Sequence, residues 1–123
     1  MSDSFYRSDA QAKVGARAVY GVDLQAPHML VARAVRSTVP CGRIESLDVS
    51  AAEAIPGVVV ITAADLPVPR YGMVIKDQPP LAGDRVRFSG EPLAAVAAPD
   101  EATLARAVAA VVVDITPEQG VYD

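Results

Sequence analysis

Apolar and polar residues alternate along several short segments of the chain, a pattern typical of β-strands. In the first of these segments, Ala18, Tyr20 and Val22 fall on one face at a period of two. A later run, Val58 to Ile61, is continuously apolar and β-branched, which is typical of a buried strand. The predicted strands cover residues 16–24, 29–36, 43–49, 58–61, 86–88, 93–98 and 111–115. Most of the regular structure is therefore expected to be β-sheet.

Two helices and one helical turn are predicted between these strands. Ser50 and Glu53 have the spacing of a capping box, in which each side chain bonds the backbone amide of the other residue. Thr62 and Asp65 repeat that spacing and predict a single helical turn. The longest helix is expected to follow Asp100 as its N-cap, because apolar residues then recur on one stripe. That stripe consists of Leu104, Ala107, Val108 and Val111.

The predicted order is β-β-β-α-β, a long loop at residues 67–82, and then β-β-α-β. Consecutive strands early in the chain suggest antiparallel pairing, and the later helices are expected to cover one face. Residues 89–92 predict a hairpin turn in which Gly90 supplies a positive φ. The pattern therefore predicts an α+β fold. The polar residues 1–13 are expected to form a flexible N-terminal arm, which leaves 14–123 as a single domain.

Composition excludes several classes of function. The net charge is −4 and the eleven basic residues are scattered, which disfavours nucleic-acid binding. The longest apolar run has seven residues, far too few to span a membrane, and the N-terminus does not resemble a signal peptide. Cys41 is the single cysteine, so an internal disulfide and a cysteine-based zinc or iron–sulfur site are excluded. A reducing, cytoplasmic location is expected.

No catalytic constellation stands out, and no catalytic, cofactor-binding or metal-binding residue is assigned. The sequence contains neither of the common glycine-rich phosphate loops, and His28 is its single histidine. Cys41 is a candidate reactive thiol if Arg36 or Arg43 favours its thiolate, but a small half-buried side chain is the alternative. Glu91 is a candidate general base, a member of the predicted turn, or an interface residue.

The loop at residues 67–82 is the best candidate for binding. It holds four prolines, which lower the entropy lost when a segment docks, together with Tyr71 and Gln78. Lys76 follows Met-Val-Ile, faintly like the modified lysine of biotin or lipoyl carriers. A carrier lysine stands at a hairpin tip between two strands, a context that the flanking prolines disfavour.

Seven short motifs also occur in order along nearly the whole chain. They are Arg7-Ser-Asp-Ala-Gln-Ala-Lys-Val-Gly15, Ala18-Val-Tyr-Gly-Val-Asp-Leu24, Arg36-Ser37, Arg43-Ile-Glu-Ser-Leu-Asp48, Pro56-Gly-Val58, Thr62-Ala-Ala-Asp-Leu-Pro67 and Gly90-Glu-Pro-Leu-Ala94. In this order and spacing the chain resembles the α/β-hammerhead domain of the molybdopterin-binding large subunit in the xanthine dehydrogenase, aldehyde oxidase and carbon monoxide dehydrogenase family. His28 stands where that family commonly has glycine, and Cys41 where it commonly has histidine.

The resemblance implies an α/β-hammerhead fold and an oxidoreductase context. In such molybdenum hydroxylases the cofactor and the catalytic glutamate lie in domains that follow the hammerhead, so it transfers no catalytic residue to this chain. It implies a non-catalytic structural and assembly domain within an enzyme that uses molybdopterin and molybdenum, [2Fe–2S] clusters and in some cases FAD. The implied partners are the remaining molybdopterin-binding domains and the iron–sulfur and flavin subunits. The candidate interface residues are Arg36, Arg43, Tyr71, Gln78 and Glu91.

Two alternatives stay open from the residues alone. One is an independent small-molecule binding or carrier-type module of barrel-sandwich architecture, centred on the 67–82 loop or on Lys76. The other is a free-standing enzyme that uses Cys41, for which a depressed thiol pKa would be the first requirement.

Overall fold

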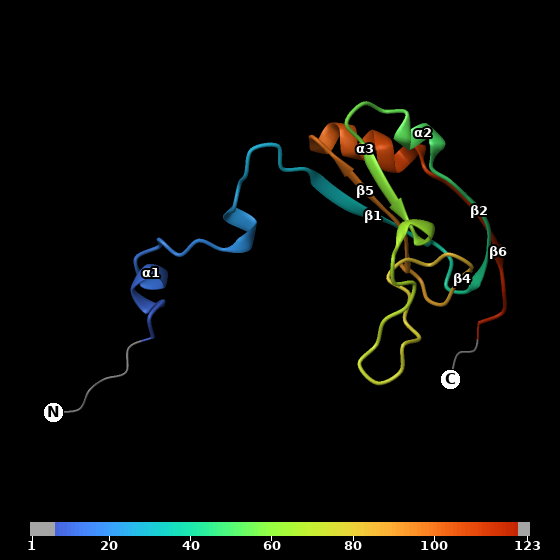
Figure 1. The fold of residues 1–123 in the computed structure, drawn as a ribbon, viewed down its shortest axis with the longest axis horizontal. Helices are drawn as coiled ribbons and strands as arrows, with labels where there is room; N and C mark the ends of the chain where they lie inside the picture. The colour runs from blue at the N-terminus through green and yellow to red at the C-terminus, as the bar shows by residue number, and fades with distance from the viewer. Residues whose placement is uncertain (1–6, 121–123) are drawn as a thin grey trace.

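The computed structural model describes residues 7–120, in which six strands form two separate three-stranded antiparallel sheets (Figure 1). Sheet A has the order β1-β5-β3, and sheet B has the order β4-β2-β6. The strands are β1 (Val31–Arg36), β2 (Gly42–Asp48), β3 (Val59–Thr62), β4 (Arg85–Val86), β5 (Pro92–Ala98) and β6 (Val112–Pro117). The predicted α+β class with antiparallel strands is therefore confirmed.

Two helices, α2 (Ser50–Glu53) and α3 (Glu101–Ala110), pack together on one face of sheet A (Figure 1). The buried core between these helices and sheet A consists of Ala52, Val96, Ala98, Leu104 and Ala107. Asp100 caps α3 as predicted, since its carboxylate accepts from the Thr103 amide at 2.8 Å and from the Thr103 hydroxyl at 2.9 Å. Leu104 and Ala107 of α3 pack over Val96 and Ala98 of β5, the central strand of sheet A.

A second, smaller core lies where sheet B meets the start of β5. Ala82, Val86 and Leu93 are buried there, and apolar residues of β2 and β6 pack against them. Because Leu93 belongs to β5 and Val86 to β4, this cluster joins the two sheets.

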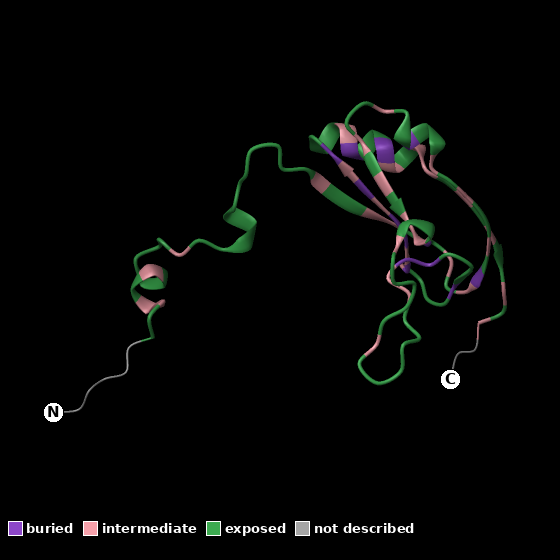
Figure 2. Cartoon of the chain, in the orientation of Figure 1, coloured by how far each residue is buried: buried purple, intermediate pink, exposed green. Residues whose placement is uncertain are grey.

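The segment before β1 runs away from both sheets and is mostly exposed (Figures 1 and 2). It contains the helix α1 (Ala10–Val14) and the 3₁₀ turn η1 (Gly21–Asp23). The strand predicted at 16–24 is wrong, because no partner strand lies beside it among the described residues and the Tyr20 amide donates instead to Asp23 Oδ2 at 3.0 Å. The boundary between an arm at 1–13 and a domain at 14–123 stays a prediction.

His28 has a φ of 61°, in the left-handed region that favours glycine. The resemblance placed His28 where glycine is common, and the backbone supplies the reason. Gly90, with a φ of 84°, has the positive φ that was predicted for it.

Three predictions, about strand pairing, a turn and a helix cap, are wrong. Consecutive early strands do not pair, since β1 pairs with β5 and β2 pairs with β4 and β6. The turn after Val86 does not close a hairpin, because it carries the chain from sheet B to sheet A. The capping box at Ser50 is also absent, because Val49 is the N-cap and the Ser50 hydroxyl donates to Asp48 Oδ1 at 2.6 Å. The predicted turn at Thr62 is confirmed as η2 (Ala63–Asp65), with the Thr62 amide donating to Asp65 at 2.8 Å.

None of the helices between residues 7 and 120 has the length and apolar character needed to cross a membrane.

Candidate functional site

A cleft of about 580 Å³ lies between the 67–82 loop and the turn that enters β5. Tyr71, Gln78 and Glu91, three of the five predicted interface residues, line this cleft together. The half-exposed ring of Phe88 and the side chain of Pro80 complete its apolar part. The structure thus gathers residues that lie up to twenty positions apart in the sequence.

A pair of backbone hydrogen bonds places Tyr71 and Gln78 opposite each other. The Tyr71 amide donates to the Gln78 carbonyl at 2.8 Å, and the Gln78 amide returns a bond to the Tyr71 carbonyl at 3.1 Å. A side chain at Gly72 would collide with the carbonyl oxygen of Ile75, so the tight tip of this loop requires glycine. The loop is therefore a closed projection with residues 72–77 at its tip.

Glu91 is buried, with only 3% of its surface exposed. Its carboxylate accepts from the Arg87 amide at 2.5 Å and forms an ion pair with Arg87 Nη1 at 3.2 Å. Arg87 also donates to the Arg85 carbonyl at 2.9 Å and approaches Asp84 at 3.4 Å. Both carboxylate oxygens of Glu91 are thus engaged by Arg87, and the interface role proposed for Glu91 stays a prediction. The local role of Glu91 is to hold the turn at the floor of the cleft.

Arg36 contacts the same turn from the end of β1. Its Nη1 donates to the Gly90 carbonyl at 2.8 Å, although the rest of the side chain is exposed. The adjacent Ser37 is buried, donates its amide to the Glu91 carbonyl at 2.9 Å and accepts from the Gly90 amide at 2.9 Å. Arg36 and Ser37 therefore tie the end of β1 to the turn that carries Glu91.

Arg43 lies elsewhere, beside a shallow hollow that it shares with Arg85 and Glu118. Cys41 is half-buried, and its sulfur lies 3.9 Å from Arg85 Nη2. Arg85 also forms a 2.6 Å ion pair with Glu118. The pKa of Arg85 is raised, first by its hydrogen bond to Cys41 and then by the charge of Glu118. The basic residue that contacts Cys41 is thus Arg85, not Arg36 or Arg43, the neighbours expected from the sequence.

Arg85 could not have been found by reading the sequence near Cys41. The two residues are 44 positions apart and meet only because β4 pairs with β2. The Arg87 partner of Glu91 is four positions away, a spacing that signals an ion pair only within a helix. Residues 87–91 form a turn, so the sequence spacing did not point to this contact.

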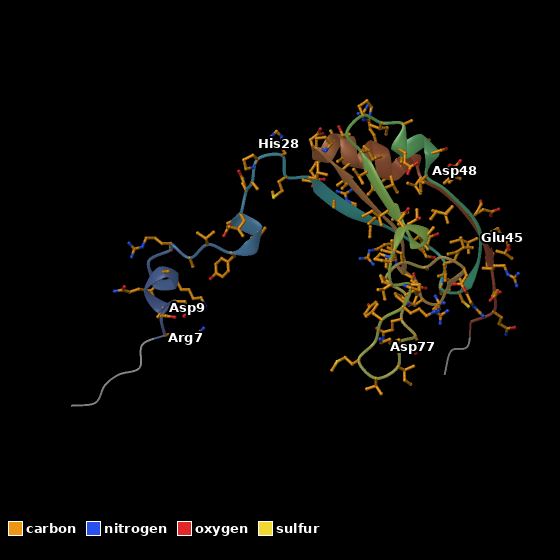
Figure 3. The ribbon with its side chains drawn as sticks, in the orientation of Figure 1. Arg7, Asp9, His28, Glu45, Asp48 and Asp77 are labelled. Atoms are coloured by element: carbon orange, nitrogen blue, oxygen red, sulfur yellow. The ribbon has the colours of Figure 1, made fainter. Side chains whose placement is uncertain are left out.

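The other ion pairs among the described residues, such as Arg33 with Glu101 at 3.0 Å, are exposed. Figure 3 shows His28 on the segment before β1, Asp48 near α2 and Asp77 on the 67–82 loop, far from one another. Among residues 7–120 there is no group of three histidine, cysteine, aspartate or glutamate side chains placed to hold a metal ion. The geometry therefore describes contact surfaces and a cleft, and no catalytic residue is assigned.

Comparison with known proteins places this geometry in a family. The sequence profile described as "Aldehyde oxidase and xanthine dehydrogenase, a/b hammerhead domain" matches residues 15–119. The nicotinate dehydrogenase large molybdopterin subunit of Eubacterium barkeri is 39% identical over 116 residues, which cover 93% of this chain and 27% of the relative. A probable xanthine dehydrogenase subunit from Bacillus subtilis (strain 168) is 43% identical over 97 residues, which cover 77% of this chain and 13% of the relative.

A solved structure of similar fold is the reconstituted CO dehydrogenase from Oligotropha carboxidovorans, with a TM-score of 0.84 and 34% sequence identity. The match covers 96% of this chain and 15% of that chain. The chain thus spans about a quarter or less of the length of the relatives that it matches.

Proposed function

The chain belongs to the aldehyde oxidase and xanthine dehydrogenase a/b hammerhead family, and we propose that it is a non-catalytic assembly domain of a molybdopterin-containing hydroxylase. In this role it packs against the molybdopterin-binding part of the enzyme, which lies outside the residues of this domain. The observation that carries the proposal is the large apolar surface that the chain leaves exposed.

The total exposed area is too large for a compact chain of this mass. A globular protein of 12.8 kDa exposes about 6,300 Å², whereas this chain exposes 9280 Å². The nine residues outside the described range could supply at most about 1,600 Å² of the excess, since an unfolded chain exposes about 1.45 Å² per dalton. The rest, about 1,400 Å², exceeds the roughly 800 Å² that each partner buries in a standard interface.

Much of this surface is apolar and lies on the segment before β1. Val22 is 92% exposed and Leu24 is 61% exposed, although both are large aliphatic side chains. The exposed apolar residues of this segment are Val14, Val19, Tyr20, Val22, Leu24, Met29 and Leu30. Seven large apolar side chains exposed along one segment support a contact with another protein.

The tip of the 67–82 loop supplies a second apolar projection. Met73, Val74 and Ile75 are largely exposed at the end of a loop that the Tyr71–Gln78 hydrogen bonds hold closed. An ordered, closed loop loses little entropy on docking, which favours binding over free motion.

We assign the iron–sulfur and flavin cofactors of the proposed parent enzyme to parts outside this domain. An iron–sulfur cluster is held by several cysteine thiolates, and Cys41 is the single cysteine of this chain. The sequence also lacks the common glycine-rich loops that bind the phosphates of nucleotide cofactors. These residues do not fit [2Fe–2S] or FAD, so no step of the redox chemistry is derived through them.

Co-purification tests the assembly role. The tagged chain is co-expressed with the portion of the Bacillus subtilis relative that it does not match. We expect the chain to co-purify and the double variant Val22→Glu/Leu24→Glu to lose binding. The matched control is Ala105→Glu/Ala109→Glu, which places the same charges at exposed positions of α3 and should still bind.

Because Val22 and Leu24 are exposed, their replacement should leave the thermal unfolding of the free chain unchanged. Failure of the unmodified chain to co-purify, or equal binding by the Val22→Glu/Leu24→Glu variant, would contradict the assembly role. Turnover of a substrate by the purified chain alone would contradict its non-catalytic character.

One observation supports a carrier-type module as a second candidate. Lys76 is exposed and lies in the tip that the Tyr71–Gln78 bridge closes, which is closer to the setting of a carrier lysine than the flanking prolines suggested. Intact mass of the chain from its native host tests this candidate, because a biotinyl or lipoyl adduct would add a defined mass that Lys76→Arg removes. A mass equal to that of the unmodified sequence would exclude it.

A further inference from the structure

The central strand of sheet A is apolar on both of its faces. Every residue from Leu93 to Ala98 in β5 is alanine, valine or leucine. A strand with one solvated face usually alternates apolar and polar residues, and a continuous apolar run is typical of a strand that is covered on both sides. In β5, Ala94, Val96 and Ala98 are fully buried, and the last two lie in the core under the helices. Ala95 and Ala97 point to the opposite side and are only half-buried.

The strand register extends this second face across the whole sheet. Ala97 pairs with Ala32 on one side and Val59 on the other, and Ala95 pairs with Ala34 and Ile61. We name this surface the open face; it consists of Ala32, Ala34, Val59, Ile61, Ala95 and Ala97. These six residues include no polar or charged side chain, and Val59 and Ile61 are 50% and 42% exposed.

The dimensions of the open face suit a single helix. Three strands spaced about 4.8 Å apart span about 10 Å between the two edge strands, which is close to the diameter of one α-helix. The alanines of β1 and β5 form a shallow floor, and Val59 and Ile61 form a ridge along one side of it. On the other side of the same strands, α3 already packs in this manner.

We propose that the open face seats an apolar α-helix contributed by the remainder of the parent enzyme, an inference that rests on the proposed assembly role. The chain spans 27% and 13% of the two relatives, so most of each relative is polypeptide that could supply such a helix. A second copy of this chain is a poorer occupant. Six residues on one face cover about 200 Å² of sheet, far less than the roughly 800 Å² per partner of a stable dimer. A partner that also contacts the segment before β1 and the tip of the 67–82 loop buries further area there. Its helix therefore need not bury about 800 Å² on the open face alone.

Charge substitution at the edge of the open face tests its occupancy. In the complex with the unmatched portion of the Bacillus subtilis relative, Val59→Glu should weaken binding by about tenfold or more, because it buries an unpaired carboxylate. The matched control is Val112→Glu, an exposed valine on β6 of sheet B that should bind as the unmodified chain does. Val59 lies on an edge strand and is half exposed, so the free variant should unfold near the unmodified midpoint.

A photo-crosslinking amino acid identifies what covers the face. With p-benzoylphenylalanine in place of Ile61, we expect cross-links to partner residues spaced three and four apart, the repeat of a helix. Cross-links at a spacing of two would indicate a strand, and cross-linked dimers of this chain would indicate a second copy. Either result would overturn the helix as occupant.

The outcomes separate this inference from the assembly role. If Val59→Glu binds normally while Val22→Glu/Leu24→Glu does not, the open face is not an interface but the assembly role stands. If the unmodified chain does not bind, the assembly role fails and the occupancy of the open face fails with it.

Discussion

The buried ion pair between Glu91 and Arg87 allows a quantitative prediction about the floor of the cleft. Glu91→Gln keeps the size and shape of the side chain, so it creates no cavity. It removes the negative charge and leaves an amide nitrogen that can face only donors of Arg87, while the second oxygen still accepts. The change therefore isolates the contribution of the charged hydrogen bonds at 2.5 Å and 3.2 Å.

The magnitude follows from the burial of the two partners. Breaking a fully buried ion pair costs about 3–5 kcal/mol. The Arg87 side chain is 36% exposed, so water screens part of the interaction. The loss should therefore be nearer to that of a hydrogen bond to a charged group, which is smaller than that of a fully buried ion pair. We expect Glu91→Gln to lower the free energy of unfolding by about 1.5–3 kcal/mol. For a chain of this size the midpoint of thermal unfolding should fall by about 6–12 °C.

Urea unfolding of the purified chain, followed by far-ultraviolet circular dichroism, measures this loss. The control is Glu45→Gln, because Glu45 is an exposed glutamate of β2 and its replacement should change stability by less than about 0.5 kcal/mol. Equal stability of the two variants would refute the assignment of Glu91 as the residue that holds the turn.

Three further predictions concern the turns and caps that position the surfaces. Gly90→Ala should lower the free energy of unfolding by about 1–2 kcal/mol because of its φ of 84°, since an added Cβ meets no atom within 4 Å. Gly21→Ala is equally unhindered and lies at an ordinary φ, so the urea midpoint of that control should stay the same or rise. Asp100→Ala should lower the midpoint of thermal unfolding by removing the cap of α3, and Asp100→Asn should retain most of the capping. An unchanged midpoint for Asp100→Ala would contradict the cap. The pKa values of Asp48, Asp65 and Asp100 are lowered, mainly by hydrogen bonds from Ser50, Thr62 and Thr103 respectively, so the folded state binds fewer protons than the unfolded state. Their contribution to the free energy of unfolding should be fully present above about pH 5 and should be lost as the pH drops through about 4. A urea midpoint that does not change between about pH 6 and pH 3 would contradict this.

Several elements could be predicted because their signals are local. The N-cap at Asp100 and the apolar stripe of α3 lie within twelve residues, and the β-branched run that becomes β3 is continuous. The positive φ of Gly90 also follows from the residue type and its place in the turn before Pro92. Each of these depends on backbone propensity and short-range hydrogen bonds, which sequence spacing describes well.

Other predictions failed where the outcome depended on a partner distant in sequence or on a choice between several hydrogen-bond acceptors. The alternation of Ala18, Tyr20 and Val22 suits a strand, but a strand also needs a neighbour to receive its backbone hydrogen bonds. The Ser50 hydroxyl had more than one possible partner, and it bonds Asp48 because the end of β2 places that carboxylate 2.6 Å away. A sequence pattern does not give the distances from a hydroxyl group to its possible acceptors.

By itself, the sequence determined the α+β class, the positions of most strands and of α3, and through its ordered motifs the resemblance to the hammerhead family. Only the tertiary structure decided which strands pair, since β1 meets β5 and β2 meets β6 across more than fifty residues of intervening chain. That pairing brings Arg85 to Cys41 and aligns Ala97 between Ala32 and Val59. The physical reason is that apolar burial and backbone hydrogen bonding are satisfied by the whole set of segments at once, so strand partners are set by the global arrangement and not by any one segment.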